Sequence, residues 1–144
     1  MGISANDLCQ HVIRPTLDYL SCHSPAAEAL LLGAAACQSA LGSALDDRRG
    51  HGLYRIASER HQQLWDQYLA LDPAGAPHLE LTVNLRYSTA IAWSLVEAAR
   101  LPLPDQHDHL AQARVWRQVF QPHGRLHEFI DAWQRCIGSL SQVA

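Results

Sequence analysis

The segment SPAAEALLLGAAACQSALG, residues 24–42, is the clearest structural signal in the chain. Ser24 followed by Pro25 is a favourable helix start, because a serine hydroxyl can accept a hydrogen bond from a free helix N–H group and proline suits the first helical position. The residues that follow are apolar on nearly every side until Gly42, which favours a helix end. A helix that is apolar all round must be covered on all sides, so this segment predicts a buried central helix.

The rest of the chain also has mostly helical patterns. Helical turns are expected on either side of Pro15 between residues 4 and 20, and an amphipathic helix is expected to begin at Ser58, which can cap it. Three more helices are expected over residues 78–100, 108–121 and 125–140. Residues 43–56 contain turn-forming glycines and aspartates that suit a small hairpin. The sequence therefore predicts one all-α domain of about six helices over residues 1–144.

Composition narrows the class of protein. The chain has 144 residues, of which 48% are hydrophobic and 17% charged, with a formal net charge of -3. These values describe a globular protein large enough to bury a core, and the absence of a clustered basic face argues against nucleic acid as a partner. No run approaches eighteen apolar residues and no secretory signal is recognisable, so we expect no membrane insertion and a cytoplasmic protein as synthesised.

Metal and cofactor signals are weak. The four cysteines form no C-x-x-C pair, which favours free thiols over a zinc ribbon. The nine histidines lack the spacing of a helical zinc site, so we interpret them as solvated surface residues. No nucleotide fingerprint or nucleophile elbow is present, and the four tryptophans sit at helical spacing that suits core packing. We therefore expect no metal and no cofactor.

Three stretches carry a resemblance to a known family. They read LLLGAAACQSALG (Leu30 to Gly42), GLYRIASERHQQLWDQYLA (Gly52 to Ala70) and NLRYSTAIA (Asn84 to Ala92), and a weaker match continues through LAQARVWRQVFQPHG (Leu110 to Gly124). In this order they resemble the lysozyme-like lytic transglycosylases, especially small phage and prophage proteins. The resemblance implies a lysozyme-like fold and a cleft for peptidoglycan, the bacterial cell-wall polymer.

The resemblance also implies a catalytic position at Gln38. In that family a glutamate at the end of the buried helix protonates the glycosidic oxygen and later accepts a proton, which requires a carboxyl group with a raised pKa. Gln38 stands at this position. An amide can bind a sugar but does not deliver a proton at neutral pH, and acid–base catalysis is worth roughly 10²- to 10⁴-fold in rate. The site is therefore expected to be inactive.

Other positions of the expected cleft also depart from the family. Arg55 replaces a glutamine, and Phe120-Gln121 replaces a Tyr-Asn pair whose hydroxyl would reach towards the glutamate. Three changes at one cleft favour natural loss of catalysis over one engineered substitution. The binding cleft is expected to comprise Ser39, Tyr54, Arg55, Asn84, Phe120 and Gln121.

Three functions follow as hypotheses. The first is a phage-type pseudoenzyme that binds a peptidoglycan strand or a protein, with Arg55 attracting an acidic group. The second is an active peptidoglycan-cleaving enzyme that uses a relocated carboxylate, Asp46, Asp47 or Glu59, although turn chemistry and a helix N-terminus also explain these acids. The third is a helical protein that acts on a host factor. Incorporation in a virion and release to the periplasm without a signal peptide both stay open.

Overall fold

The computed structural model describes residues 2–43, 50–64 and 81–138, and these are mostly helical. The helices are α1 (Ala5–Leu8), the π-helix η1 (Cys9–Ile13), α2 (Arg14–Tyr19), α3 (Pro25–Ser39), α4 (Ser58–Leu64), α6 (Leu85–Ala99), α7 (His109–Val119) and α8 (Leu126–Cys136). The prediction of an all-α fold is confirmed. In these described ranges no helix has both the length and the apolar character needed to cross a membrane.

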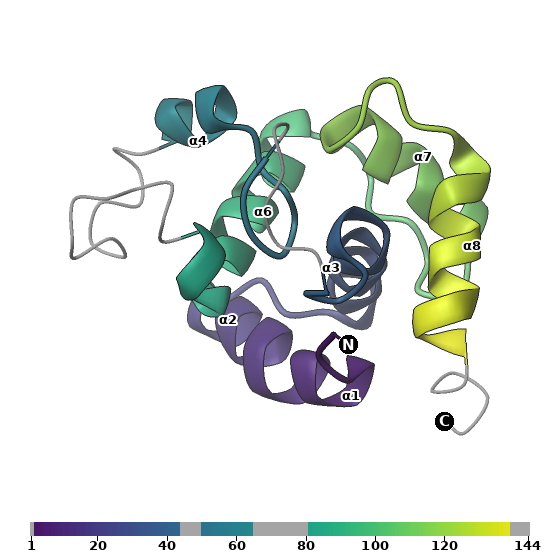
Figure 1. Cartoon of the computed structure of the whole chain (residues 1–144), viewed down its shortest axis with the longest axis horizontal. Helices are drawn as coiled ribbons and strands as arrows, with labels where there is room; N and C mark the ends of the chain where they lie inside the picture. The colour runs from purple at the N-terminus through teal and green to yellow at the C-terminus, as the bar shows by residue number, and fades with distance from the viewer. Residues whose placement is uncertain (1, 44–49, 65–80, 139–144) are drawn as a thin grey trace.

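Helix α3 lies at the centre of the other helices (Figure 1). It packs against η1, α6, α7 and α8. Its first turn is capped as predicted, since the Ser24 hydroxyl accepts a hydrogen bond from the Ala27 N–H and Pro25 takes the first position. Leu30, Leu31 and Ala34 are fully buried, so the central position expected for this helix is confirmed.

The end of α3 comes before the predicted glycine. Ala40 and Leu41 already have the left-handed φ values of 51° and 55°, and Gly42 continues the turn at 93°. The Leu41 N–H reaches back to the Ala35 carbonyl at 3.2 Å, which satisfies an acceptor that the helix end leaves open. This turn fixes the direction in which the last helical residues, including Gln38, present their side chains.

The first helical segment is continuous across Pro15 rather than divided by it. The chain makes one π turn just before the proline, in which the Arg14 N–H bonds to the Cys9 carbonyl. Pro15 has no N–H to donate to the His11 carbonyl, and Arg86 Nη2 from α6 donates to that carbonyl at 3.2 Å instead. The helix is therefore kept intact by a tertiary hydrogen bond.

The long helix expected over residues 78–100 is interrupted in its described part. Residues 81–83 are helical, Asn84 is extended, and α6 begins at Leu85. The Asn84 side chain accepts a hydrogen bond from the Tyr87 N–H at 3.0 Å, so asparagine acts here as an N-cap. The later two helices are shorter than predicted, because α7 ends at Val119 and the described α8 ends at Cys136.

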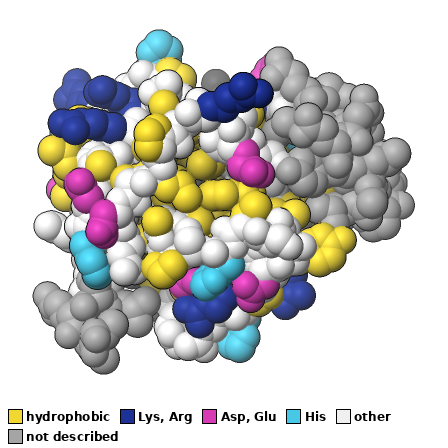
Figure 2. All heavy atoms as spheres, turned by 180° about the vertical axis from the view of Figure 1, so that it is seen from behind, with side chains coloured by type: hydrophobic (Ala, Val, Ile, Leu, Met, Phe, Trp, Pro, Cys, Tyr) yellow, Lys and Arg dark blue, Asp and Glu magenta, His cyan; other side chains and the backbone are white. Residues whose placement is uncertain are grey.

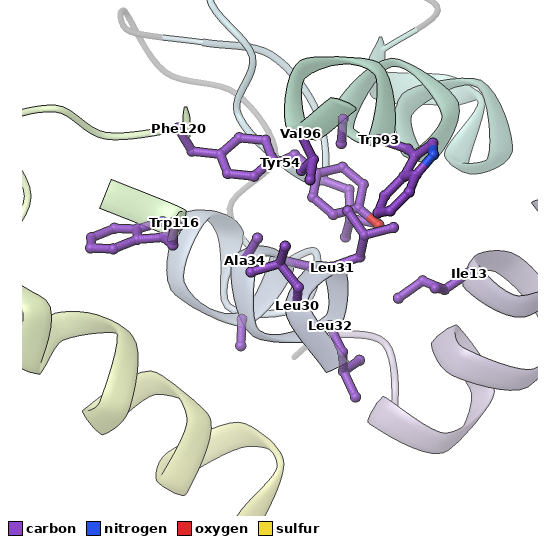
Figure 3. Packing of buried hydrophobic residues seen from close by; sticks show 14 of the residues in the cluster. Ile13, Leu30, Leu31, Leu32, Ala34, Tyr54, Trp93, Val96, Trp116 and Phe120 are labelled. Carbon is purple, nitrogen blue, oxygen red and sulfur yellow. The ribbon is translucent and has the colours of Figure 1, made fainter. Parts of the chain in front are cut away.

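The buried core surrounds α3 (Figure 3). Trp93, Trp116 and Trp133 are 5%, 1% and 6% exposed, which confirms the prediction of core packing for these three, and Trp65 lies outside the described residues. His61 corrects the interpretation of the histidines as surface residues. It is fully buried, and its Nε2 lies 2.6 Å from the hydroxyl of Tyr87.

The opposite face of the molecule carries a band of hydrophobic side chains with charged and histidine side chains around it (Figure 2). The large hydrophobic residues that are exposed among the described ones come from four separate parts of the chain. They are Tyr19, Val83, Leu103 and Leu110. Single exposed apolar residues of this kind are ordinary on a protein surface.

Candidate functional site

Gln38 lies in the last turn of α3, where its side chain is 8% exposed. Its Nε2 donates a hydrogen bond to the Tyr54 carbonyl at 3.2 Å. Its Oε1 accepts one from the indole Nε1 of Trp116 at 3.3 Å. Both ends of the amide are therefore bound within the protein.

These two partners fix the orientation of the amide. An indole N–H can only donate and a backbone carbonyl can only accept, so the oxygen must face Trp116 and the nitrogen must face Tyr54. An ionised carboxylate at this position would place an oxygen against the Tyr54 carbonyl, with no proton between them. The surroundings of Gln38 are thus complementary to an amide.

The turn that brings Tyr54 to Gln38 is held by close backbone contacts. His51 and Ile56 form an antiparallel bridge, with N–H···O=C distances of 3.0 and 3.1 Å in the two directions. Gly52 has a φ of +80°, and a Cβ there would lie 1.9 Å from the Leu81 carbonyl oxygen. Of the predicted small hairpin, the described residues show this one bridge, and residues 44–49 of it lie outside them.

Ser39 ties the same turn to α3. Its hydroxyl donates to the Leu53 carbonyl at 2.6 Å, and its Oγ accepts from the Gly42 N–H at 3.1 Å. Ser58, expected as a cap, is instead the first residue of α4, and its hydroxyl lies 2.9 Å from His51 Nε2. The turn is therefore tied to α3 through Ser39 and Leu53, and to α4 through His51 and Ser58.

A pocket of about 480 Å³ opens beside Gln38. Its walls come from the end of α3, from the turn and α4, from α6, from α7 with the residues that follow it, and from the first turn of α8. The lining residues are Cys37, Gln38, Arg55, Ile56, Ala57, Arg60, Leu95, Trp116, Gln118, Phe120, Gln121, Pro122 and Glu128. The pocket thus combines aromatic and aliphatic surface with amides and charged groups.

The structure brings part of the predicted cleft together at this pocket. Arg55, Phe120 and Gln121 line it with Gln38, although Arg55 lies far from residues 120 and 121 in the sequence. Phe120 is 8% exposed and stacks on the ring of Tyr54 at a centroid distance of 6.4 Å. Figure 3 shows these two rings side by side above the end of α3.

Three residues of the predicted cleft do not line the pocket. Ser39 holds the turn, and Asn84 caps α6. The Tyr54 ring is buried, its hydroxyl lies 3.0 Å from the Thr89 hydroxyl, and burial raises its pKa above the ordinary value for tyrosine. Ser39, Tyr54 and Asn84 therefore have structural roles, which are to hold the turn, pack in the core and cap α6.

The sequence analysis missed Arg60 and Glu128, which both line the pocket. Arg60 follows Glu59 in the first turns of α4, but Glu59 itself is exposed and does not line the pocket. Glu128 is the acid of the pocket wall among the described residues, and its Oε1 accepts from the Arg125 N–H at 2.7 Å as part of a helix cap. Asp46 and Asp47 lie outside the described residues.

A thiol also borders the pocket. Burial and then the negative charge of Glu128 raise the pKa of Cys37 to about 12. A thiol with so high a pKa is almost entirely protonated at neutral pH and is a poor nucleophile. Cys37 therefore contributes surface to the pocket rather than a reactive group.

A second pocket, of about 590 Å³, lies between the N-terminal helices and α8. Its wall contains Glu28, whose carboxylate accepts hydrogen bonds from Arg14 at 2.8 and 3.1 Å and from the Cys9 thiol at 2.5 Å. His23 Nε2 also contacts this carboxylate. Burial by itself would raise the pKa of Glu28, but the bonds from Arg14, Cys9 and His23 outweigh it and lower the pKa to about 2. The charges of this cluster are balanced within the protein.

In the part of the chain that the structure describes, no group of three His, Cys, Asp or Glu side chains is placed to hold a metal ion. The four cysteines are free. Comparison of the chain with protein-family models, curated proteins and solved structures finds no match in any of the three. The case for function therefore depends on the pocket beside Gln38 and on the motifs of the sequence.

Proposed function

We propose that the chain is a lysozyme-like protein that binds a peptidoglycan strand in the pocket beside Gln38 and does not cleave it. The observation that carries this proposal is the hydrogen bonding of Gln38, whose amide is held between the Tyr54 carbonyl and the Trp116 indole N–H. General acid catalysis needs a group that can release a proton to the leaving oxygen, and an amide so bound does not supply one.

The character of the pocket wall supports binding of a sugar. Trp116 and Phe120 give apolar surface, while Gln118 and Gln121 give amide donors and acceptors. Sugar rings present both C–H surface and hydroxyl groups, so this combination suits them. A volume of about 480 Å³ falls in the usual range for ligand pockets.

The acids of the wall support binding over cleavage. Glycosidases of the two-carboxylate type place two acids on either side of the scissile bond. Within the described residues the wall contains Glu128 alone, and this carboxylate already accepts a hydrogen bond from its own helix. Glu59, one of the relocated acids considered from the sequence, does not reach the wall.

The binding test is an NMR titration of the ¹⁵N-labelled protein with a soluble four-sugar peptidoglycan fragment. We expect saturable shifts of the Gln38 amide and Trp116 indole signals. Gln121→Ala should weaken binding about 2- to 10-fold, the usual value of one or two hydrogen bonds. Arg114→Ala, which changes an exposed residue outside the pocket wall, is the matched control. The proposal fails if the fragment leaves these signals unchanged, or if Arg114→Ala and Gln121→Ala weaken binding equally.

A further inference from the structure

Arg60 presents a positive charge to the pocket, and no acid of the described residues is paired with it. Its side chain lines the wall, and its Nη1 donates a hydrogen bond to the Val119 carbonyl. No acidic side chain of the described residues forms an ion pair with it. This bond uses one of the five N–H donors of the guanidinium group.

Arg60 is half-buried, and its burial has an electrostatic cost. Removing a cation from water is unfavourable unless an opposite charge or hydrogen bonds replace the lost hydration. Burial accordingly lowers the pKa of Arg60 from its ordinary value, although arginine stays charged at neutral pH. An anion in the pocket would supply the negative charge that the described residues do not place beside Arg60.

The rest of the wall reinforces this preference. Glu128 is the one carboxylate of this wall among the described residues, and it accepts a hydrogen bond from the Arg125 N–H rather than pairing with Arg60. The contrast with the second pocket is informative, because there Arg14 is paired with Glu28 at 2.8 Å. Arg14 in the second pocket is therefore paired with an acid, whereas Arg60 forms no ion pair with an acid of the described residues.

We propose that Arg60 binds a carboxylate group of the ligand, so that the pocket selects saccharides that carry an acid. A planar carboxylate matches the two parallel N–H donors of a guanidinium group, and such bidentate pairs are strong and directional. This inference rests on the proposed function, because it assumes that a saccharide occupies the pocket. It assigns the selectivity of the pocket to Arg60.

The test compares two saccharides that differ at one carboxyl group. N-acetylmuramic acid carries a carboxylate, and its methyl ester has the same ring without the charge. We expect the acid to bind the unmodified protein at least ten times more tightly than the ester, as measured by NMR titration. The difference should shrink as sodium chloride is raised, because salt screens charge pairs at a partly exposed site.

Variants of Arg60 assign the preference to this residue. Arg60→Gln should abolish the preference for the acid, Arg60→Lys should keep part of it, and Arg114→Gln should keep all of it. Thermal unfolding of each variant checks that the fold is retained. Equal binding of acid and ester by the unmodified protein, or a preference that survives Arg60→Gln, would overturn the inference and leave the proposed function standing.

A different result would separate the two proposals. If neither saccharide binds and the four-sugar fragment does not bind either, the proposed function fails, and acetate then tests Arg60 alone. Saturable shifts of the Arg60 Nε–H signal and of backbone amides around the pocket with acetate, with the backbone shifts lost in Arg60→Gln at the same concentrations, would support a carboxylate site that serves another ligand. No shift with acetate would overturn the inference as well.

Discussion

The hydrogen bonds of Gln38 explain why this residue is more than a missing acid. The resemblance of the sequence implies that Gln38 stands at a catalytic position, but it does not show which groups face Gln38. The structure adds the Tyr54 carbonyl, which accepts, and the Trp116 indole, which donates. These partners lie 16 and 78 residues away along the chain, so no local pattern reveals them.

Gln38→Glu should therefore make stability depend on pH. The new carboxyl can bond to the Tyr54 carbonyl only while it keeps its proton, so folding should raise its pKa. A raised carboxyl pKa means that the folded state binds more protons than the unfolded one, and stability falls as pH rises above the unfolded pKa of about 4.3. We expect the variant to lose about 1–3 kcal/mol more at pH 7 than at pH 4, relative to the unmodified protein.

Urea unfolding at the two pH values measures this difference. Gln118→Glu, on the exposed side of α7, makes the same chemical change without a facing carbonyl and should show little pH dependence. Equal losses at pH 4 and pH 7 for Gln38→Glu would show that the Tyr54 carbonyl does not constrain the group. Gln38→Glu should also leave purified cell walls intact, because Arg55 and Phe120 still stand where the resembled family has a glutamine and a tyrosine.

The helices show which features can be predicted locally and which cannot. The start of α3 follows from Ser24 and Pro25, whose preferences act within one turn. Helical turns were predicted on either side of Pro15, and the structure joins them; the carbonyl of His11, which the proline leaves without its helical donor, accepts from Arg86, a residue 75 positions away. The start of α6 at Leu85, with Asn84 as its cap, lay inside a longer apolar pattern, which hid the cap.

The turn before α4 makes a prediction about Gly52. An alanine there would need the left-handed φ of +80°, and its Cβ would meet the Leu81 carbonyl oxygen at 1.9 Å. Both effects are unfavourable, so Gly52→Ala should cost more than about 2 kcal/mol in the free energy of unfolding. Gly138→Ala is the control, because a Cβ there meets nothing nearer than 4.0 Å. Similar denaturation midpoints for the two variants would contradict the described turn.

The molecule as a whole is held around α3, and Glu28 links this helix to the N-terminal segment. The pKa of Glu28 is about 2, below its ordinary value, because bonds from Arg14, Cys9 and His23 outweigh the opposing effect of burial. A lowered carboxyl pKa contributes stability above the unfolded value and loses it as pH falls towards the folded value. Its contribution should therefore disappear between about pH 4.5 and pH 2.

Glu28→Gln tests this link. The variant should be about 1–2 kcal/mol less stable than the unmodified protein at pH 6, since hydrogen bonds to a charged group become bonds to a neutral one. The difference should vanish near pH 2, as measured by thermal or urea unfolding. Asp131→Gln, at an exposed position of α8, is the control. A difference that persists unchanged at pH 2 would show that charge at Glu28 is not the cause.

Part of the candidate site could be predicted from the sequence. The resemblance placed Gln38, Arg55, Phe120 and Gln121 in one cleft, and the structure has all four at one pocket. Arg60 and Glu128 were missed because their roles depend on how α4 and α8 meet the end of α3. A sequence pattern cannot show that a charged residue such as Arg60 forms no ion pair with the described residues around it.

The central claim is that the pocket holds a glycan without cleaving it, and the most direct measurement follows the fate of the ligand during binding. The protein is incubated with a soluble peptidoglycan fragment at saturating concentration, and the fragment is then analysed by mass spectrometry. We predict that the fragment is recovered intact from a sample in which NMR shows the Gln38 amide signal fully shifted. Fragments with anhydro ends or new reducing ends, formed in proportion to protein and time, would contradict the claim.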